Sequence, residues 1–390
     1  MSPWVSAGCA AWITLASAGA STGEVQRPIG PDPGTAPPGP TDLSQASTTV
    51  LTAAVGPDDC AGSIPLRLRV AQLVWPAVYG DGLTDAAQLF AELAVGGATV
   101  MTFPESATDN DLLALKNAGA LPLLLATDEE GGDVQRFRRL GAFPAAADVA
   151  TSMTSAAAEA MIAAHAERLA AAGIDVVFAP VVDVAMLGGG GPLGDRTFSD
   201  DPAVVTGYAA AYIAGWQSAG IVPVLKHFPG HGSASGDTHD TFATTPPLAQ
   251  LRARDLLPYA ALAPTGAGVM VAHVQVPGLD EEMPASLSSV AIDSLLRGEY
   301  GYADALVFTD ALGMDAITER YSIPDAAGLA IAAGADVVIF TNTDETADVI
   351  AGIVGAVESG RIGEQRVNDA VSRVLAAKGL TMCGMAGLVT

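Results

Sequence analysis

Residues 226–239 are the stretch of the chain best equipped for chemistry, because they hold three of its five histidines and one of its three lysines. Glycines and prolines break any helix here, so we expect a loop that leaves a strand. His227, His231, Asp237 and His239 are all residue types that bind metal ions, so a metal site is one interpretation. Histidines satisfied by backbone hydrogen bonds are another, since no helix brings His227 and His231 onto one face. The glycines around Asp237 and His239 instead favour a loop that moves over a substrate.

Further polar residues follow other apolar runs of the sequence, at points where strands are expected to end. Asp128 begins an Asp-Glu-Glu-Gly-Gly segment after one run, and Asp183, His273 and Asp310 each follow another. The loop of residues 226–239 begins in the same way. In barrel enzymes the carboxyl ends of the parallel strands meet at one rim, where the chemistry takes place. We therefore expect these groups to gather at a single rim.

Eight apolar runs, separated by longer amphipathic segments, must position these residues. The runs are Val70–Val74, Ala98–Phe103, Leu121–Thr127, Val176–Val182, Ile221–Leu225, Gly268–Ala272, Ala305–Thr309 and Asp336–Phe340. The helical candidates include Asp109–Ala118, Ser155–Ala172, Pro202–Ala219, Leu248–Leu262, Pro324–Ala333 and Thr346–Glu358. Runs that are apolar on both faces are typical of parallel strands covered by helices. Eight such units favour the α/β class and a single (β/α)₈ TIM-type barrel. A doubly wound sheet is the alternative, but no Gly-x-Gly-x-x-Gly motif follows the first strand.

The composition limits what such a barrel can bind. Of the 390 residues, 50% are hydrophobic and 16% are charged, which excludes a disordered chain and provides material for a large core. The formal net charge of −25 at pH 7 repels phosphate backbones and anionic lipid surfaces, so nucleic acid is not an expected partner. An acidic enzyme or small-molecule binder, expected to be a monomer, is consistent with both properties.

Residues 1–58 are expected to lie outside the folded domain, which we place at residues 59–390. Residues 1–20 resemble a secretory leader, although they lack a basic n-region and their apolar stretch is too short to span a membrane. A start codon placed too far downstream is one explanation, and a degenerate lipobox with a lipid anchor at Cys9 is the other. An ordinary disordered tail is the alternative to export. Residues 21–58 are rich in Pro, Gly, Ser and Thr, which suits a tether.

Two further cysteines flank the periodic part of the chain. Cys60 and Cys383 lie just outside its two ends. A disulfide between them would join the ends of the domain in an oxidising compartment, and two unpaired thiols are the alternative.

Five segments carry a shared pattern. They are Asp128-Glu129-Glu130-Gly131-Gly132 with Gln135-Arg136, Phe178-Ala179-Pro180-Val181-Val182-Asp183-Val184, Gly194-Asp195-Arg196-Thr197-Phe198, Lys226-His227-Phe228-Pro229-Gly230-His231-Gly232 with Asp237-Thr238-His239, and Phe308-Thr309-Asp310-Ala311-Leu312-Gly313-Met314. In this order they resemble the β-N-acetylglucosaminidase branch of glycoside hydrolase family 3. The leader, the tether and the flanking cysteines resemble its envelope forms in actinobacteria. Any one segment is weak evidence for the family, but five segments in the family's order are very specific.

The resemblance implies a retaining mechanism with Asp310 as the nucleophile and His239 as the acid/base. Asp237 would orient and polarise His239, since an aspartate fixes the tautomer of a neighbouring imidazole and stabilises its protonated form. The alternative for this pair is a turn-forming aspartate beside a solvated histidine. Ala311 stands where this branch often has a second aspartate, which makes Asp310 the less ambiguous choice. The sandwich domain of larger family members is expected to be absent.

The other matched positions are expected to bind an N-acetylglucosamine ring through its hydroxyl groups. They are the acceptor Asp128 and the donors Arg136, Arg196, Lys226 and His227. Lys226 and Arg196 are also expected to hold Asp310 ionised. A surface ion pair is the alternative for Arg136.

Four more polar residues are not assigned to the sugar. Glu130 and Asp183 are expected to organise the rim, and His165, in an Ala-rich helix, to be structural. His273 fits either a subsite wall or a packed rim position. No cofactor and no metal are expected.

The expected function is therefore an exo-acting β-N-acetylglucosaminidase that cuts terminal GlcNAc from muropeptides, peptidoglycan fragments or related glycans. It is expected outside the cytoplasm or in the cell envelope. A broader β-hexosaminidase, a β-glucosidase or a phosphorylase would use the same site. A non-catalytic sugar-binding lipoprotein is the alternative from another class, although a binder has no need of Asp237, His239 and Asp310 together.

Overall fold

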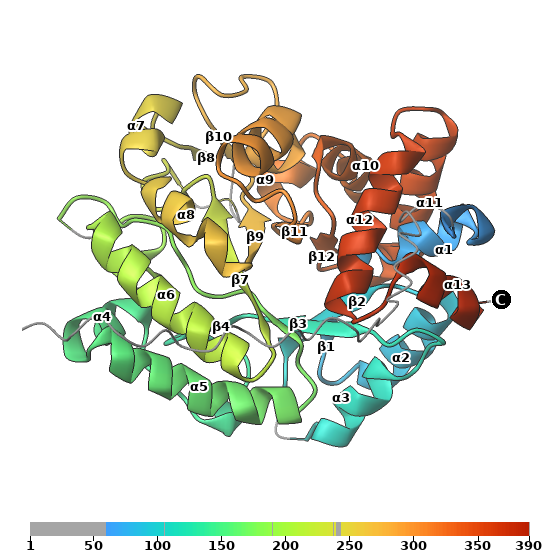
Figure 1. Ribbon diagram of the computed structural model, residues 1–390, viewed down its shortest axis with the longest axis horizontal. Helices are drawn as coiled ribbons and strands as arrows, with labels where there is room; N and C mark the ends of the chain where they lie inside the picture. Colours follow the sequence, from blue (N-terminus) through green and yellow to red (C-terminus); the bar gives the residue numbers. More distant parts are fainter. Residues whose placement is uncertain (1–59, 105, 189, 237, 239–242, 390) are drawn as a thin grey trace, which may run out of the picture. The chain divides into compact units, whose positions relative to one another are not determined.

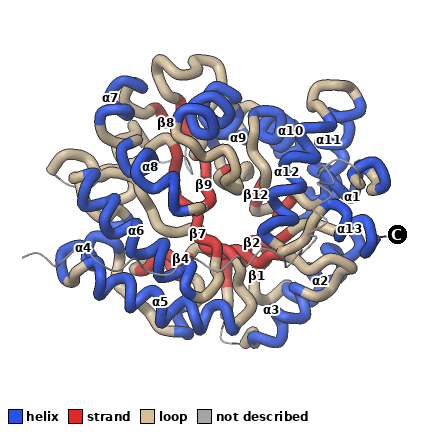
Figure 2. The backbone as a smooth tube through the Cα atoms, viewed as in Figure 1, coloured by secondary structure: helices blue, strands red, loops and turns tan. Residues whose placement is uncertain are grey.

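The computed structural model describes residues 60–104, 106–188, 190–236, 238 and 243–389. The expected leader and tether, Cys9, Asp237 and His239 lie outside the described residues. The folded unit that contains the described residues has its strands at the centre and its helices around them (Figures 1 and 2).

The central sheet is a nearly closed parallel barrel. Its strands are β1 (Val74–Tyr79), β2 (Gly97–Thr102), β3 (Leu124–Thr127), β6 (Val176–Val177), β7 (Val222–Phe228), β9 (Gly268–Val271), β11 (Val307–Thr309) and β12 (Val338–Phe340). Their spatial order follows the chain, and every neighbouring pair is parallel. A bridge between Phe308 and Val337 joins the last two strands. The (β/α)₈ expectation is confirmed.

The barrel interior is filled by large aromatic side chains. The ring of Phe308 packs edge to face against Trp75 and against Phe178, with centroid distances of 5.3 and 5.4 Å. All three side chains are fully buried. Such edge-to-face contacts add to the free energy gained by burial, so this packing links β1, β11 and the residue after β6 through the barrel interior.

Helices cover the outside of the barrel (Figure 2). They are α1 (Leu66–Ala71), α2 (Leu83–Leu93), α3 (Asp109–Lys116), α4 (Ala146–Ser152), α5 (Ser155–Ala171), α6 (Pro202–Ser218), α7 (Leu248–Ala253), α8 (Leu257–Leu262), α9 (Asp315–Thr318), α10 (Ile323–Ala333), α11 (Thr346–Glu358), α12 (Glu364–Ala377), α13 (Met382–Val389) and a π-helix, Val290–Glu299. The longest two begin at side-chain caps, because Thr154 and Asp201 accept hydrogen bonds from the backbone N–H groups of Ala157 and Ala203. Across the described residues, no helix combines the length and apolarity that a bilayer crossing needs.

The first strand lies further along the chain than the sequence predicts. Val70 belongs to α1, and β1 begins at Val74, so the prediction of a strand over Val70–Val74 is wrong. The apolar run joins the buried end of a helix to the start of a strand, and periodicity alone does not separate them. Pro76 is tolerated inside β1 because the strand changes partner there, pairing with β12 up to Pro76 and with β2 from Ala77.

The predicted helix over Leu248–Leu262 is two short helices, α7 and α8. The backbone leaves the helical region at Arg254, with φ −145° and ψ −70°, and Pro258 lies in the first turn of α8. Because proline lacks an N–H group, it suits the start of a helix and not its interior.

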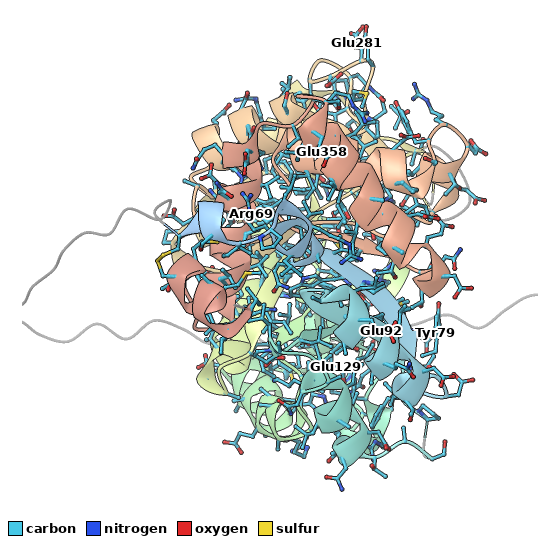
Figure 3. The ribbon with its side chains drawn as sticks, turned by 90° about the vertical axis from the view of Figure 1, so that its right-hand side faces the viewer. Arg69, Tyr79, Glu92, Glu129, Glu281 and Glu358 are labelled. Carbon is cyan, nitrogen blue, oxygen red and sulfur yellow. A yellow bond between two sulfur atoms is a disulfide. The ribbon has the colours of Figure 1, made fainter. Side chains whose placement is uncertain are left out.

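The two ends of the described chain meet at the amino ends of the strands. Arg69 of α1, labelled in Figure 3, donates hydrogen bonds to Asn368 and Glu364 of α12, each at 2.6 Å. A disulfide links Cys60 to Cys383, 323 residues apart, so the predicted pairing of these cysteines is confirmed. These contacts tie the first and last helices of the barrel together.

Candidate active site

A cavity of about 370 Å³ lies at the carboxyl ends of the strands, a size typical of small-molecule sites. Its lining includes two threonines, Thr99 and Thr341, and six ionisable residues, Asp128, Arg136, Arg196, Lys226, His227 and Asp310. The six ionisable residues are all of the predicted site residues that the structure describes, and the fold brings them together. Its apolar lining includes Phe178 and Met314, which belong to two of the motif segments, and Met101, Met270 and Ile339, which lie outside them. Met101, Met270 and Ile339 could have been found only as members of the apolar runs, a signal shared with much of the core.

Lys226 is the centre of a buried ion-pair network. It lies near the end of β7, and its Nζ is 2.7 Å from Oδ1 of Asp128 and 2.5 Å from Oε1 of Glu130. The Lys226 and Glu130 side chains are only 2% and 4% exposed. Arg196 donates from Nε and Nη2 to the two Glu130 oxygens, each at 2.8 Å. Glu130 therefore organises the rim, as expected, because it forms ion pairs with both Lys226 and Arg196.

This network governs the charge states of its members. Burial by itself would raise the pKa of Asp128, but the charges of Lys226, Arg136 and Arg196 outweigh it and lower that pKa to about 2. Burial of Lys226 works the other way, and the neighbouring carboxylates overcome it to raise the lysine pKa. At neutral pH the site therefore presents ionised carboxylates and protonated cations, which suit the hydroxyl groups of a sugar.

Asp183 organises the turn that follows β7. Its Oδ2 accepts hydrogen bonds from the backbone N–H of His227 at 2.9 Å and from Nδ1 of the same residue at 2.7 Å. Its Oδ1 accepts from the backbone N–H of His231 at 2.5 Å. Although Asp183 is fully buried, these two histidines lower its pKa. The expected rim-organising role of Asp183 agrees with this geometry.

Asp310 stands directly after β11 and faces the same cavity. Its Oδ1 accepts a hydrogen bond from the backbone N–H of Ala311 at 2.8 Å. Burial would raise the pKa of Asp310, but the charges of His227 and His273 together with this hydrogen bond outweigh it and lower the pKa. Lys226 makes a smaller contribution, and Arg196 instead directs its guanidinium to Glu130. The carboxylate is therefore kept ionised, chiefly by groups other than those the sequence indicated.

A second buried pair supports the loop that carries Asp128. His165 of α5 is 2.8 Å from Oε1 of Glu129, and Oε2 of Glu129 accepts from the backbone N–H groups of Arg136 and Phe137. Glu129 lies among the interior side chains in Figure 3, whereas Glu281 stands at the tip of a loop. The expected structural role of His165 agrees with these contacts.

Two predicted residues take positions that the sequence left open. Arg136 lines the cavity 3.4 Å from Asp128, so it is more than a surface ion pair. His273 is fully buried, with Nδ1 2.7 Å from the Ser286 hydroxyl and Nε2 3.0 Å from the carbonyl of Ala311. His273 is therefore a packed residue behind Asp310.

No group of three or more His, Cys, Asp or Glu side chains is arranged for a metal ion among the described residues. Of the four candidate ligands, His227 and His231 both contact Asp183, and Asp237 and His239 lie outside the described residues.

The chain is similar to known proteins over most of its length. A family model described as the glycosyl hydrolase family 3 N terminal domain matches residues 66–377. Beta-hexosaminidase LpqI of Mycobacterium tuberculosis is 38% identical over 362 residues, which cover 89% of this chain and 92% of that protein. A beta-hexosaminidase of Xylella fastidiosa is 40% identical over 253 residues, which cover 62% of this chain and 74% of that protein.

Solved structures show the same architecture. A glycosyl hydrolase family 3 member from Mycobacterium smegmatis is 39% identical with a TM-score of 0.78, and the match covers 82% of this chain and 99% of that one. A family 3 β-N-acetylglucosaminidase from Paenibacillus is 32% identical with a TM-score of 0.76, and the match covers 81% of this chain and 62% of that one.

Proposed function

Because the chain belongs to glycosyl hydrolase family 3, we propose that it is an exo-acting β-N-acetylglucosaminidase that removes terminal β-linked GlcNAc with retention of configuration. It is an enzyme of the β-N-acetylhexosaminidase class. One observation carries the proposal: an ionised Asp310 shares a cavity of about 370 Å³ with Asp128, Lys226 and His227. This combination provides a nucleophile beside groups that bind sugar hydroxyls.

Asp310 would form the covalent intermediate. Retaining glycosidases need a carboxylate nucleophile below the anomeric carbon, and the lowered pKa keeps Asp310 in the nucleophilic form. Since Oδ1 accepts the hydrogen bond from Ala311, Oδ2 is the oxygen that would attack. The bond from the anomeric carbon to the leaving oxygen breaks as the bond to Oδ2 forms.

Protonation of the leaving group is assigned to His239, with Asp237 as its orienting partner. The support is the sequence motif, since both residues lie outside the described residues. His239 would give its proton to the departing oxygen and later accept one from the attacking water, which restores Asp310 and releases GlcNAc.

The substrates are proposed to be GlcNAc-containing glycans or muropeptides, cut by a monomer outside the cytoplasm or in the cell envelope. The Cys60–Cys383 disulfide supports export, because such bonds persist in oxidising compartments. The apolar segment of residues 4–20 supports a leader, with Cys9 as the candidate lipid anchor.

Metabolic labelling with a fatty acid in wild-type and Cys9→Ser cells tests the anchor. Light scattering of the purified protein tests the monomeric state.

Turnover of p-nitrophenyl N-acetyl-β-glucosaminide is the first test of function, with the matching glucoside as the specificity control. Proton NMR of the initial product distinguishes the outcomes: β-GlcNAc supports retention, and α-GlcNAc excludes a covalent intermediate. Repeating the reaction in phosphate buffer shows whether a sugar phosphate forms, which would reveal phosphorolysis.

A fluorinated glycosyl inactivator should label Asp310, and Asp310→Ala should abolish turnover while the protein stays folded. Asp344→Ala, at an exposed aspartate in the loop that follows β12, is the matched control and should keep full activity. Labelling of Asp128 or Glu130 would contradict the nucleophile assignment.

A further inference from the structure

The β2 side of the cavity contains a hydroxyl group that the described chain leaves without a partner. Thr99 of β2 lines the cavity, and its side chain is only 3% exposed. Among the described residues, its Oγ1 has no hydrogen-bond partner. A buried hydroxyl that makes no hydrogen bond lowers stability, so such groups are rare in folded proteins. A hydroxyl kept at this place indicates a partner that enters the cavity from outside.

The register of the sheet places Thr99 close to Asp128. Thr99 is in register with Ala126 of β3, and Asp128 follows Ala126 by two residues. Side chains two residues apart on a strand lie on the same face, so Thr99 is one layer deeper in the barrel than Asp128. Met101, two residues after Thr99, also lines the cavity, which agrees with this alternation. Thr99 therefore belongs to the floor of the cavity on the Asp128 side.

The residues level with Thr99 are small. Thr99 pairs with Ala77 of β1 and with Ala126 of β3, whose side chains are methyl groups. Neither methyl group can bond to the hydroxyl or cover it as a larger side chain would. Rotation about the Cα–Cβ bond brings the hydroxyl or the methyl group of a threonine toward the cavity while the backbone stays in place. The hydroxyl of Thr99 can therefore meet a ligand there.

Arg136 provides a second unused polar group on the same side of the cavity. It directly follows β5 (Val134–Gln135), and its Nη2 lies 3.4 Å from Oδ2 of Asp128. Its Nε is buried and has no hydrogen-bond partner within the part of the chain that the structure describes. Two unpaired groups thus line the cavity near one ionised carboxylate. This set suits a hydroxyl-bearing ligand, because a hydroxyl group both donates and accepts hydrogen bonds.

This side of the cavity lies across the barrel from the proposed nucleophile. Strand β3 is four strands from β11 in either direction around the closed sheet, and β2 is the neighbour of β3. A sugar whose anomeric carbon C1 meets Asp310 therefore presents the opposite edge of its ring to Asp128 and Thr99. In GlcNAc that edge carries the hydroxyl groups at C4 and C6.

We propose that Thr99 is a substrate-binding residue whose hydroxyl contacts a hydroxyl group of GlcNAc at the edge of the ring opposite C1. The inference rests on the proposed function, because it takes Asp310 as the group that meets C1. Thr99 then adds to the predicted sugar-binding set a residue that lies in none of the five sequence segments.

The test compares substrates that have and lack the hydroxyl groups in question. Thr99→Val replaces the hydroxyl with a methyl group of similar size. We expect kcat/KM for p-nitrophenyl N-acetyl-β-glucosaminide to fall about 3- to 30-fold, because a sugar hydroxyl loses its partner. For either the 4-deoxy or the 6-deoxy analogue, whichever lacks the contacted hydroxyl, the variant should differ from wild type by at most about twofold. Thr99→Ser keeps the hydroxyl and should stay within about threefold of wild type on the parent substrate.

Thermal unfolding separates a binding role from a structural one. The midpoint of Thr99→Val should equal that of wild type or lie about 1–3 °C above it, because the variant loses a buried hydroxyl without a partner in the described chain. Thr346→Val is the matched control, since Thr346 is 1% exposed, lies outside the cavity lining and donates to the carbonyl of Thr343 at 2.5 Å. It should lower the midpoint and leave the kinetics unchanged.

The outcomes distinguish the inference from the proposed function. A loss on the parent substrate that disappears on one deoxy analogue supports the inference and identifies the hydroxyl. An unchanged kcat/KM, or an equal loss on all three substrates, overturns it while turnover by the wild-type protein upholds the function. If the wild-type protein does not hydrolyse the parent substrate, the proposed function fails and the inference falls with it. Thr99→Ala takes the place of Thr99→Val in the same comparison if the latter does not fold.

Discussion

The carboxylate of Asp183 accepts hydrogen bonds from both the backbone N–H and the ring of His227, at 2.9 and 2.7 Å. Because the lowered pKa keeps Asp183 ionised, it can only accept, so Nδ1 of His227 carries the proton of that bond. Nε2 is then the ring nitrogen left for a ligand in the cavity that His227 lines. One buried carboxylate thus decides which ring nitrogen His227 presents to the cavity.

Asp183→Asn should raise KM about 5- to 150-fold, because an amide places a donor where two donors already point, at a cost of about 1–3 kcal/mol. Steady-state kinetics with the p-nitrophenyl substrate measure the effect. Asp344→Asn, at an exposed rim position, is the control and should match the wild-type protein. An unchanged KM in folded Asp183→Asn would show that the orientation of His227 does not matter for binding.

His273→Gln should move the acidic limb of the pH–kcat profile to higher pH. Burial raises the pKa of Asp310 and the charges of His227 and His273 lower it, so removing one charge lets that pKa rise. Asp310, the proposed nucleophile, is then protonated at a higher pH than in the wild-type protein. Ser286→Ala removes a hydrogen-bond partner of His273 without removing its charge, and its acidic limb should stay in place.

Lys226→Met should lower the free energy of unfolding by about 3–5 kcal/mol at pH 7, because it leaves Asp128 and Glu130 buried without their shared cation. Arg252→Met, which breaks an exposed pair with Glu299, should cost at most about 1 kcal/mol. Urea unfolding monitored by circular dichroism gives both values. Similar losses in the two variants would mean that the buried network contributes little.

The stability cost of Lys226→Met should also depend on pH. The pKa of Asp128 is lowered to about 2, against about 3.9 in an unfolded chain. Its contribution is therefore fully present above about pH 4 and is lost as the pH falls through about 2. The difference between wild type and Lys226→Met should shrink when unfolding is measured at pH 3 and below. A constant difference across this range would exclude Asp128 as the partner that matters.

Replacing Cys60 and Cys383 by serine should lower the unfolding free energy by about 2–5 kcal/mol while turnover at 25 °C persists. The bond closes a 323-residue loop at the amino ends of the strands, away from the cavity at the carboxyl ends. Thermal unfolding with and without reductant measures the loss, and only the wild-type protein should respond to the reductant. Peptide mapping of protein from its native host should find the two cysteines joined; free thiols there would remove the support for export.

Much of the fold of this protein could be predicted from short stretches of its sequence. Apolar runs and capped helices depend on neighbours a few residues away, so the barrel could be predicted, together with the placement of Asp310 and Lys226 near strand ends. Where two local signals merge, as at Val70–Val74, the boundary between helix and strand was misplaced. Local patterns determine which residues are present at the rim and on which kind of element.

Only the tertiary structure decided which of those residues meet. Lys226 and Asp128 are 98 residues apart, Arg196 and Glu130 are 66 apart, and His165 and Glu129 are 36 apart. Their distances are set by the closure of the barrel, which no local pattern encodes. For the same reason the sequence indicated Arg196 as a partner of Asp310, whereas the folded chain directs it to Glu130 and leaves His227 and His273 to keep Asp310 ionised. Residue type determined what chemistry was available, and the packing of distant segments determined the charge on each group.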